Sequence, residues 1–473
     1  MEGSRLVPRL GALLPLLCAA FASTPSTAAA QAKATRPVWP DEGPSTWTGR
    51  VTTPDITAND LRTRLYQFAD DSMMGRRIGE LGNYKGTSYV GREFQRLGLA
   101  PAGENGTYFQ TLPYGPAGID AATARLIADG APLSRKTEWI PLAPGGIVGA
   151  SGRADLDSVP TVFAGRWGDT TALDEARFHG KIAVFVASPV SLGLMGRQAG
   201  PTLRCDSVPD KFGAAAAARV EAAQRAADSA AVRRGVARSI FIRDTRAQRA
   251  GAAGVLLVAL DSTPRATIDA AFTPRGAMQP SAPSPQAVSG AVISSAAAVK
   301  LFGHPVEQIA VGTAGAPVTA HWQYEWHASQ WPARNVIAVL RGSDPARAGE
   351  YVLVSAHNDH VGTNPVAVDH DSLRAVNMVT RRQGANDPVC RPTPEQQHEI
   401  DSLIARARGI RPPRRDSIMN GADDDGSGTV LLLEIAEKFA RERPARSVIF
   451  VSHEGEEAGL LGSRWFTDHP TIP

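Results

Sequence analysis

Little in the composition points to a charged partner, a membrane or a cysteine framework. The 473-residue chain has 50 basic and 47 acidic side chains, and its net charge of +3 gives no reason to expect nucleic acid or an anionic membrane as a partner. No uninterrupted apolar stretch reaches the length of a membrane-spanning helix. The three cysteines form no C-x-x-C arrangement, which argues against a structural zinc cluster. What is present, with 43% hydrophobic residues, is typical of a globular protein with a large core.

The N-terminus has the features of an export signal. Arg5 and Arg9 precede an apolar run from about Leu10 to Ala22, and small residues follow this run. We therefore predict a signal peptide over residues 1–32. The product would be secreted or periplasmic, with no membrane contact after the signal is cleaved.

Two cysteines remain once Cys18 leaves with the signal. Cys205 and Cys390 could pair in an oxidising compartment. Both lie in Pro-rich, loop-like surroundings far apart in the sequence, so their spacing does not show whether they meet.

The rest of the chain divides into three regions by its hydrophobic pattern. Residues 33–118 begin with a Pro/Thr-rich stretch to about residue 50, which we expect to be an extended tail. Two amphipathic helices follow, one beginning after Thr57 and one over about 85–97. Residues 119–318 hold short strands separated by turns. Residues 319–473 alternate strands with helices, which predicts an α/β layered domain.

Two segments interrupt these patterns. Residues 214–238 are rich in Ala and Arg and predict an extra surface helix. Residues 363–420 are rich in Pro and Arg and predict a long loop or lid with one helix near 395–407. The sequence does not indicate what this long loop does.

Three polar clusters lie at strand or helix ends in the last region. They span residues 357–360 after one strand, 423–425 before a helix, and 454–457 after the strand at 447–451. Ligand sites in open α/β sheets form at the carboxyl ends of strands, so we expect the clusters to meet. Histidine with several carboxylates suits zinc, manganese or cobalt. A carboxylate that serves two ions bridges them at about 3.5–4 Å, as in two-metal hydrolases.

Each cluster also has a purely structural explanation. The three aspartates could cap the following helix, His357 could be a polar strand end, and residues 454–457 could be a solvated turn. Their joint occurrence favours a metal site. An H-E-x-x-H zinc motif is excluded because position 457 is glutamate, and Ser427 lacks the surroundings of a serine nucleophile.

Taken together, the clusters resemble the co-catalytic di-zinc aminopeptidases of the aminopeptidase Y and bacterial leucyl aminopeptidase type, which are related to glutamate carboxypeptidase and transferrin receptor. The matching segments are Ser-Ala-His-Asn-Asp-His-Val-Gly at 355–362, Gly-Ala-Asp-Asp-Asp-Gly-Ser-Gly at 421–428 and Glu-Glu-Ala-Gly-Leu-Leu-Gly-Ser at 456–463. The resemblance implies a three-layer α/β zinc-peptidase fold with a mixed central sheet, incomplete at the C-terminus. Residues 119–318 similarly resemble an inserted, β-rich protease-associated (PA) domain.

The resemblance implies roles for five residues. His357 and Glu457 would bind one zinc ion each, and Asp424 would bridge the two ions and precede a cis peptide bond. Asp359 would orient the His357 imidazole. Glu456 would be the general base that takes a proton from the attacking water.

The family also has an Asp and a His ligand well downstream of the glutamate pair, and here the sequence ends at Pro473. We therefore expect a C-terminally truncated chain, in which each ion lacks one protein ligand and which is inactive by itself.

These features predict a zinc-dependent aminopeptidase that removes N-terminal residues from peptide substrates. A carboxypeptidase of the same fold and a non-catalytic, receptor-like binding protein are the alternatives. Retention of Glu456 and Glu457 argues against the receptor-like alternative, and no arginine pair that would grip a substrate carboxylate is evident. Side-chain specificity, natural substrate and oligomeric state do not follow from the sequence.

Overall fold

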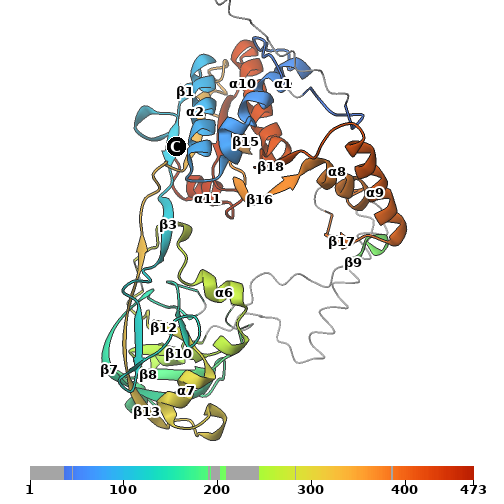
Figure 1. The fold of residues 1–473 in the computed structure, drawn as a ribbon. Coiled ribbons are helices and arrows are strands. Elements are labelled where there is room, and N and C mark those ends of the chain that lie inside the picture. Colours follow the sequence, from blue (N-terminus) through green and yellow to red (C-terminus); the bar gives the residue numbers. More distant parts are fainter. Residues whose placement is uncertain are drawn as a thin grey trace, which may run out of the picture.

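The computed structural model describes residues 37–472, apart from residues 45, 147, 190–191, 193–202, 209–243, 283 and 385–386. The predicted signal peptide at 1–32 and the predicted surface helix at 214–238 lie outside the described residues. Two bodies, each built on its own sheet, and a helical hairpin beside the first body make up the described part (Figure 1).

A five-stranded mixed sheet forms the centre of the first body. Its strand order is β1–β14–β19–β15, and β2 pairs with β14. β14 runs antiparallel to β19, whereas β15 runs parallel to it. This mixed sheet confirms the predicted α/β architecture. The strands are β1 (Ala100–Pro101), β2 (Phe109–Thr111), β14 (Arg334–Leu340), β15 (Tyr351–His357) and β19 (Ser447–His453).

Helices cover both faces of this sheet because its strands alternate apolar side chains between the faces. On one face lie α1 (Ala58–Phe68), α2 (Leu81–Arg96) and α10 (Gly428–Glu442), whose apolar residues pack against Phe450 (Figure 1). On the other face α11 (Leu461–Asp468) packs through Phe466. As predicted, α1 begins after Thr57, which forms a capping box with Asp60.

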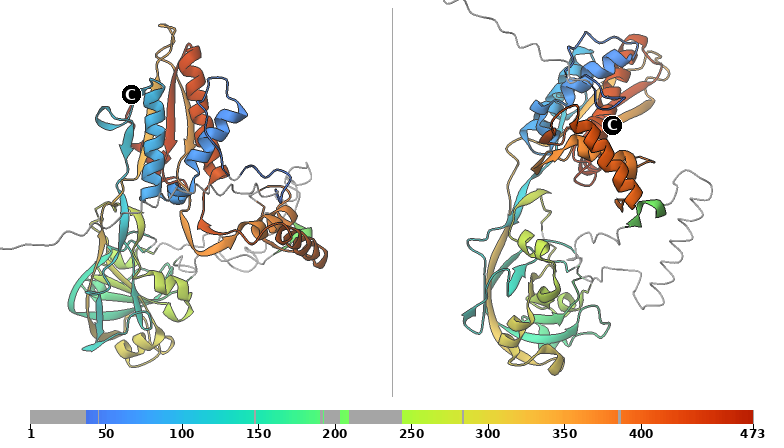
Figure 2. Two further views of the ribbon diagram at one scale, coloured as in Figure 1. Left: turned by 45° about the horizontal axis from the view of Figure 1, so that its top comes forward. Right: turned by 45° about the vertical axis from the view of Figure 1, so that its right-hand side comes forward.

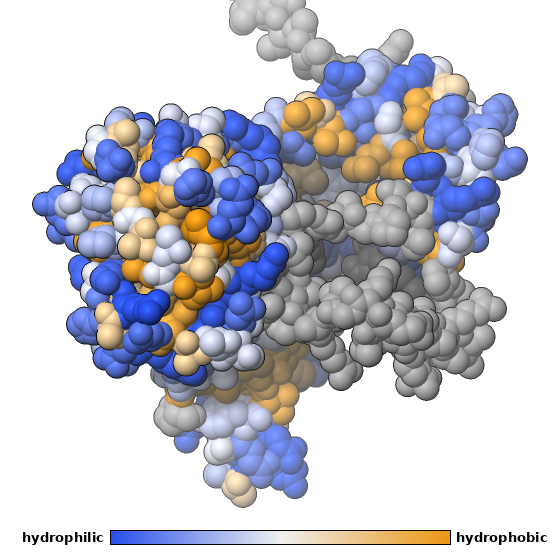
Figure 3. Space-filling model, turned by 90° about the horizontal axis from the view of Figure 1, so that it is seen from below, coloured by the Kyte–Doolittle hydropathy of each residue, from blue (hydrophilic) through white to orange (hydrophobic). Residues whose placement is uncertain are grey.

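The second body is built on a ten-stranded sheet with the order β11–β3–β13–β7–β8–β10–β12–β6. β4 pairs with β13 and β5 pairs with β4. The sheet has an apolar core on each face. The outer surface of this body carries both polar and apolar residues (Figure 3). Its boundaries as a separate domain over residues 119–318 stay a prediction. The elements are β3 (Tyr114–Ile119), β4 (Arg125–Ala128), β5 (Ala131–Pro132), β6 (Trp139–Pro141), β7 (Arg153–Arg166), α3 (Glu175–Phe178), β8 (Ile182–Val186), α5 (Arg246–Arg249), β10 (Gly254–Val258), α6 (Arg265–Ala270), β11 (Arg275–Met278), β12 (Ser289–Ile293), α7 (Ser295–Phe302) and β13 (Ala314–Trp326).

The segment at 363–420 is a folded hairpin with two helices. The predicted helix near 395–407 is present at 394–408, but the prediction of a long loop around it is wrong, because residues 370–380 form a further helix. The helix at 370–380 is not evident in the sequence, because its short amphipathic run lies between Pro- and Arg-rich stretches. β16 and β18 pair at the base of the hairpin, and α8 packs against α9. The elements are β16 (Thr363–Asp369), α8 (His370–Thr380), β17 (Cys390–Arg391), α9 (Pro394–Arg408) and β18 (Arg415–Ile418).

Part of the predicted tail at 33–50 is packed against this hairpin. Trp39 is 1% exposed and belongs to the same apolar cluster as Ala375 and Ile400. Its indole Nε1 donates a hydrogen bond to Asp371 Oδ1 at 2.9 Å. The tail is therefore anchored, which a Pro/Thr-rich composition does not indicate.

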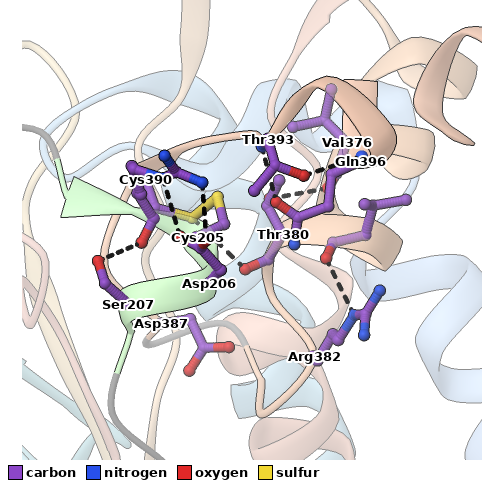
Figure 4. Close-up of a disulfide and its surroundings, with 12 residues drawn as sticks. Cys205, Asp206, Ser207, Val376, Thr380, Arg382, Asp387, Cys390, Thr393 and Gln396 are labelled. Carbon is purple, nitrogen blue, oxygen red and sulfur yellow. Dashed lines mark hydrogen bonds and ion pairs between the residues drawn. A yellow bond between two sulfur atoms is a disulfide. The ribbon is translucent and has the colours of Figure 1, made fainter. Parts of the chain in front are cut away.

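Cys205 and Cys390 form a disulfide with a Cα–Cα distance of 4.9 Å (Figure 4). The bond joins the hairpin to β9 (Leu203–Arg204), which pairs in parallel with β17. β9 thus lies beside the hairpin rather than in the ten-stranded sheet (Figure 2). The pairing that the sequence left open is therefore present in the structure.

Among the helices of the described residues, none has the length and apolar content needed to cross a membrane.

Candidate functional site

The three polar clusters meet at one edge of the five-stranded sheet, as predicted. β15 and β19 are parallel neighbours, and His357 is paired with His453 at their carboxyl ends. The Asn358 amide then donates to the His453 carbonyl oxygen at 2.8 Å, which carries the pairing into the loops. The cluster at 423–425 lies in the short helix η6 (Ala422–Ser427) that leads into α10.

His357 connects the cluster at 357–360 to the aspartates at 423–425. Its Nε2 lies 3.0 Å from Asp424 Oδ1, and its Nδ1 lies 3.2 Å from the Asp359 carbonyl oxygen and 3.5 Å from the Asp359 carboxylate. Burial lowers the pKa of His357, but the hydrogen bond and charge of Asp359, with the charges of Asp425 and Asp424, outweigh burial and raise the pKa to about 9. The imidazole is thus held between two carboxylates.

The aspartates at 423–425 divide the two roles that the sequence left open. Asp425 accepts hydrogen bonds from the amide of Gly428 at 2.9 Å and from the amide of His357 at 3.2 Å. It therefore caps the start of α10 and connects it to the end of β15. Asp424 points its carboxylate at the His357 ring and is 69% exposed. The peptide bond between Asp424 and Asp425 is cis, as the resemblance implied.

Asp359 fixes the turn that follows β19. Its carboxylate is fully buried and accepts hydrogen bonds from the amides of Glu456 at 3.0 Å and Glu457 at 3.3 Å. The same carboxylate lies beside the His357 ring. Asp359 is therefore placed to orient both the imidazole and the glutamate pair.

The two neighbouring glutamates of this turn have different surroundings. Glu457 Oε1 lies 2.8 Å from Nδ1 of His360, to which the sequence analysis gave no role. The spacing of His357 and His360 directly after a strand is the signal that could have indicated it. Within the described part of the chain, the Glu456 carboxylate has no hydrogen-bond or ion-pair partner.

Glu454 is a buried acid with no part in these pairs. Its side chain is fully buried, its Oε1 has no hydrogen-bond partner within the described residues, and its amide donates to Asn335 Oδ1 at 2.9 Å. Burial raises the pKa of Glu454 well above its ordinary value, and the charge of Asp359 adds to this increase. The turn thus combines one buried acid with two less buried acids, Glu456 and Glu457.

The donors fit zinc in their chemistry but are too few in number. Imidazole and carboxylate groups are ordinary zinc ligands, and a catalytic zinc ion takes three of them from the protein. The structure gathers two pairs, His357 with Asp424 and His360 with Glu457. Over the described ranges, no group of three or more His, Cys, Asp or Glu side chains is arranged to hold a metal ion.

A cavity of about 720 Å³ opens beside Glu457 and His360. Arg77 and Glu80 from the first body line it, as does Arg275 from the second body. A few residues of an extended peptide could occupy such a volume, next to Glu457.

An α/β sheet that brings histidine and carboxylates together at its carboxyl edge is characteristic of metal-dependent hydrolases. Residues 398–473 match the model of peptidase family M28. The C-terminal part of the chain is therefore similar to this family.

Curated relatives match over short stretches. The chain is 48% identical over 52 residues to a vacuolar membrane protease of Candida glabrata, covering 11% of this chain and 6% of that protein. It is 48% identical over 60 residues to aminopeptidase NAALADL1 of Rattus norvegicus, covering 11% and 8%. It is 37% identical over 83 residues to a probable zinc metalloprotease of Pyricularia oryzae, covering 14% and 16%. The chain thus spans between 6% and 16% of the length of these relatives.

Solved structures match over most of the chain with low scores. An aminopeptidase from Aneurinibacillus sp. strain AM-1 is 13% identical, with a TM-score of 0.34 and coverage of 87% of this chain and 66% of that one. The zinc aminopeptidase BSAP of Bacillus subtilis is 15% identical, with a TM-score of 0.32 and coverage of 88% and 66%.

Proposed function

We propose that the full-length protein is an exported, zinc-dependent aminopeptidase that removes N-terminal residues from peptides. The observation that carries the proposal is that two pairs, His357 with Asp424 and His360 with Glu457, lie at one sheet edge in a chain whose C-terminal part matches peptidase family M28. The names of the matched aminopeptidases and zinc metalloprotease support the same activity. The second body would be the inserted PA domain.

In this proposal His357, Asp424 and Glu457 would be ligands of the zinc ions. Bound zinc would polarise the scissile carbonyl group and lower the pKa of the attacking water. Glu456 would accept the proton of that water, because its carboxylate has no competing partner within the described residues. Asp359 would hold the His357 ring and the Glu456 and Glu457 amides in place.

The deciding experiment is an assay of the full-length protein against a panel of aminoacyl-anilides, with and without a chelator. Chelator-sensitive release of the amine is expected. If no peptide or anilide is cleaved in a chelator-sensitive way, the proposed activity is refuted.

A carboxypeptidase of the same fold is the second candidate. Arg77 and Arg275 line the cavity beside Glu457, and a guanidinium group binds a free carboxylate well. Parallel assays of N-acetylated peptides with a free C-terminus and of amidated peptides with a free N-terminus separate the two candidates. Cleavage of the acetylated set alone would favour the carboxypeptidase.

A further inference from the structure

A buried arginine outside the three clusters contacts the loops that carry two of them. Arg76 ends the short helix η1 (Asp71–Arg76), which connects α1 to α2, and none of its surface is exposed. Its Nε donates to the Asn358 carbonyl oxygen at 3.0 Å. Its two terminal nitrogens donate to the carbonyl oxygens of Asn420 at 2.6 Å and Gly421 at 2.7 Å. One rigid guanidinium group therefore joins the loop after β15 to the loop before α10.

The main chain around Arg76 also contacts the loop after β15. Met74, Gly75 and Arg76 have φ angles of 51°, 69° and 45°, a left-handed run that is costly for residues other than glycine. A Cβ atom at Gly75 would lie 2.3 Å from the Gly362 carbonyl oxygen, so only glycine fits at this approach. The Arg76 carbonyl oxygen in turn accepts a hydrogen bond from the His360 amide at 3.0 Å. The backbone and the side chain of Arg76 thus hold the same loop at two points.

The charge of Arg76 is also placed toward the site. Among the described residues it has no ion-pair partner within contact distance, and its hydrogen bonds go to neutral carbonyl oxygens, including that of Phe68 at 3.0 Å. Burial lowers the pKa of Arg76 to about 10, while the charges of Asp359 and Asp425 oppose this decrease. A buried cation without a direct partner is costly for folding. The cost is offset where the cation neutralises the negative charge of a cluster of carboxylates.

We propose that Arg76 is a positioning residue of the site: its guanidinium group locks the loop at 358–360 to the loop at 420–421 and so sets the place of His357 relative to Asp424. That these loops form a catalytic site rests on the function proposed above. The connection of the two loops through Arg76 does not depend on that function. Arg64 provides a matched control, because it is also buried in the first body but pairs with Glu93, Glu434 and Glu437, away from both loops.

The lock can be tested by hydrogen exchange followed by mass spectrometry on the chain itself. Arg76→Met should speed amide exchange over residues 358–362 and 420–426 at least tenfold. Arg76→Lys should fall between Arg76→Met and the parent, because lysine keeps the charge but cannot span three loop carbonyls with a planar fork. Arg64→Met should speed exchange in the helices α1, α2 and α10 and leave the two loops at the parental rate. The proposal would be overturned if amide exchange in both loops of Arg76→Met stayed at the parental rate. It would also be overturned if Arg64→Met sped exchange in the two loops as much as Arg76→Met does.

If Arg76→Met does not fold, as judged by near-ultraviolet circular dichroism, the Arg76→Lys comparison decides in the same way. A second readout uses the full-length protein with Zn²⁺ as the probe. Zinc affinity and kcat should fall about 10- to 100-fold in Arg76→Met, the usual effect of losing an outer positioning contact. Arg64→Met should change only the unfolding temperature. A parent protein without chelator-sensitive turnover would refute the proposed function, whereas the exchange rates would still decide on Arg76.

Discussion

His360 and Glu457 face each other across the edge of the five-stranded sheet, with Nδ1 of the histidine 2.8 Å from Oε1 of the glutamate. The two side chains are 16% and 24% exposed, and both line the open cavity at this edge. It joins the loop after β15 to the turn after β19 beyond the last backbone pairing of the two strands. The position of the Glu457 carboxylate therefore depends on His360.

His360→Ala should lower the Zn²⁺ affinity of the full-length protein about 10- to 100-fold, because an outer contact that orients a ligand has this usual effect. His360→Gln keeps a polar group at the position and should recover part of the loss. Competition titration with a chromophoric chelator measures the affinity. The exposed His304 is the control position, and His304→Ala should leave the affinity unchanged. Parental affinity in His360→Ala would mean that Glu457 is oriented without its neighbour.

Glu456→Gln should lower kcat by about 10²- to 10⁴-fold, the range for loss of a general base. The metal content should stay at the parental value, because the change keeps the side-chain shape and leaves Glu457 intact. Elemental analysis of the purified protein, run beside the anilide assay, makes the comparison. Glu442→Gln at the exposed end of α10 serves as the control and should behave as the parent. Loss of metal in proportion to activity would show that Glu456 is a ligand and not the base.

The strands and clusters of the site could be predicted because their signals are local. β-branched runs followed directly by polar residues indicate where β15 and β19 end, and parallel strands end at the same edge. The choice among Asp423, Asp424 and Asp425 could not be made from the residues alone. Three consecutive aspartates have the same chemistry, and only the path of the backbone decides which of them caps α10 and which faces His357.

Arg76 and Trp39 were beyond prediction for a different reason. The Arg76 guanidinium group contacts carbonyl oxygens 282 and 344 positions away along the chain, and every residue has a carbonyl oxygen. Trp39 likewise packs on a hairpin more than three hundred residues later, with a separation of 332 to Asp371. Such long-range contacts leave no periodic pattern in the sequence.

Glu454→Gln should make the protein more stable than the parent as the pH rises above about 4.5. The folded-state pKa of Glu454 lies above the ordinary value of 4.5 because of burial and then the Asp359 charge. When the folded protein has the higher pKa, the stability that the group contributes is fully present below the pKa of the unfolded protein. It is lost as the pH rises through the pKa of the folded protein. Glutamine does not titrate, so the variant escapes this loss, which amounts to at most about 1.4 kcal/mol per pH unit.

Urea unfolding of the parent and of Glu454→Gln between pH 4 and 8 tests this expectation. The difference in free energy of unfolding should grow with pH, while Glu442→Gln should show a flat difference. A flat difference for Glu454→Gln as well would mean that the acid keeps an ordinary pKa despite its burial.

Asp371 holds the helical hairpin and the anchored tail together, and its replacement should loosen both. The buried carboxylate accepts hydrogen bonds from Trp39 Nε1 at 2.9 Å and from Arg411 at 2.6 Å. The Arg411 hydrogen bond, opposed by burial and supported by Trp39 and Arg414, lowers the pKa of Asp371. When the folded protein has the lower pKa, the stability that the group contributes is present above the pKa of the unfolded protein, 3.8. It is lost as the pH falls through the pKa of the folded protein. The hairpin should therefore lose stability as the pH falls below about 3.8.

Asp371→Asn should destabilise the hairpin by about 2 kcal/mol, less than the roughly 3–5 kcal/mol for breaking an isolated buried pair, because Arg411 keeps Glu42 as a partner. Native-state hydrogen exchange over α8 and α9 measures the local free energy of opening. The fluorescence of Trp39, obtained as the difference from a Trp39→Phe protein, should shift to longer wavelength as the indole becomes exposed. Asp401→Asn on the exposed side of α9 is the matched control and should change neither quantity. If Asp371→Asn speeds exchange throughout the first body to the same extent as in the hairpin, the hairpin opens only with global unfolding, and its anchoring of the tail has no independent stability.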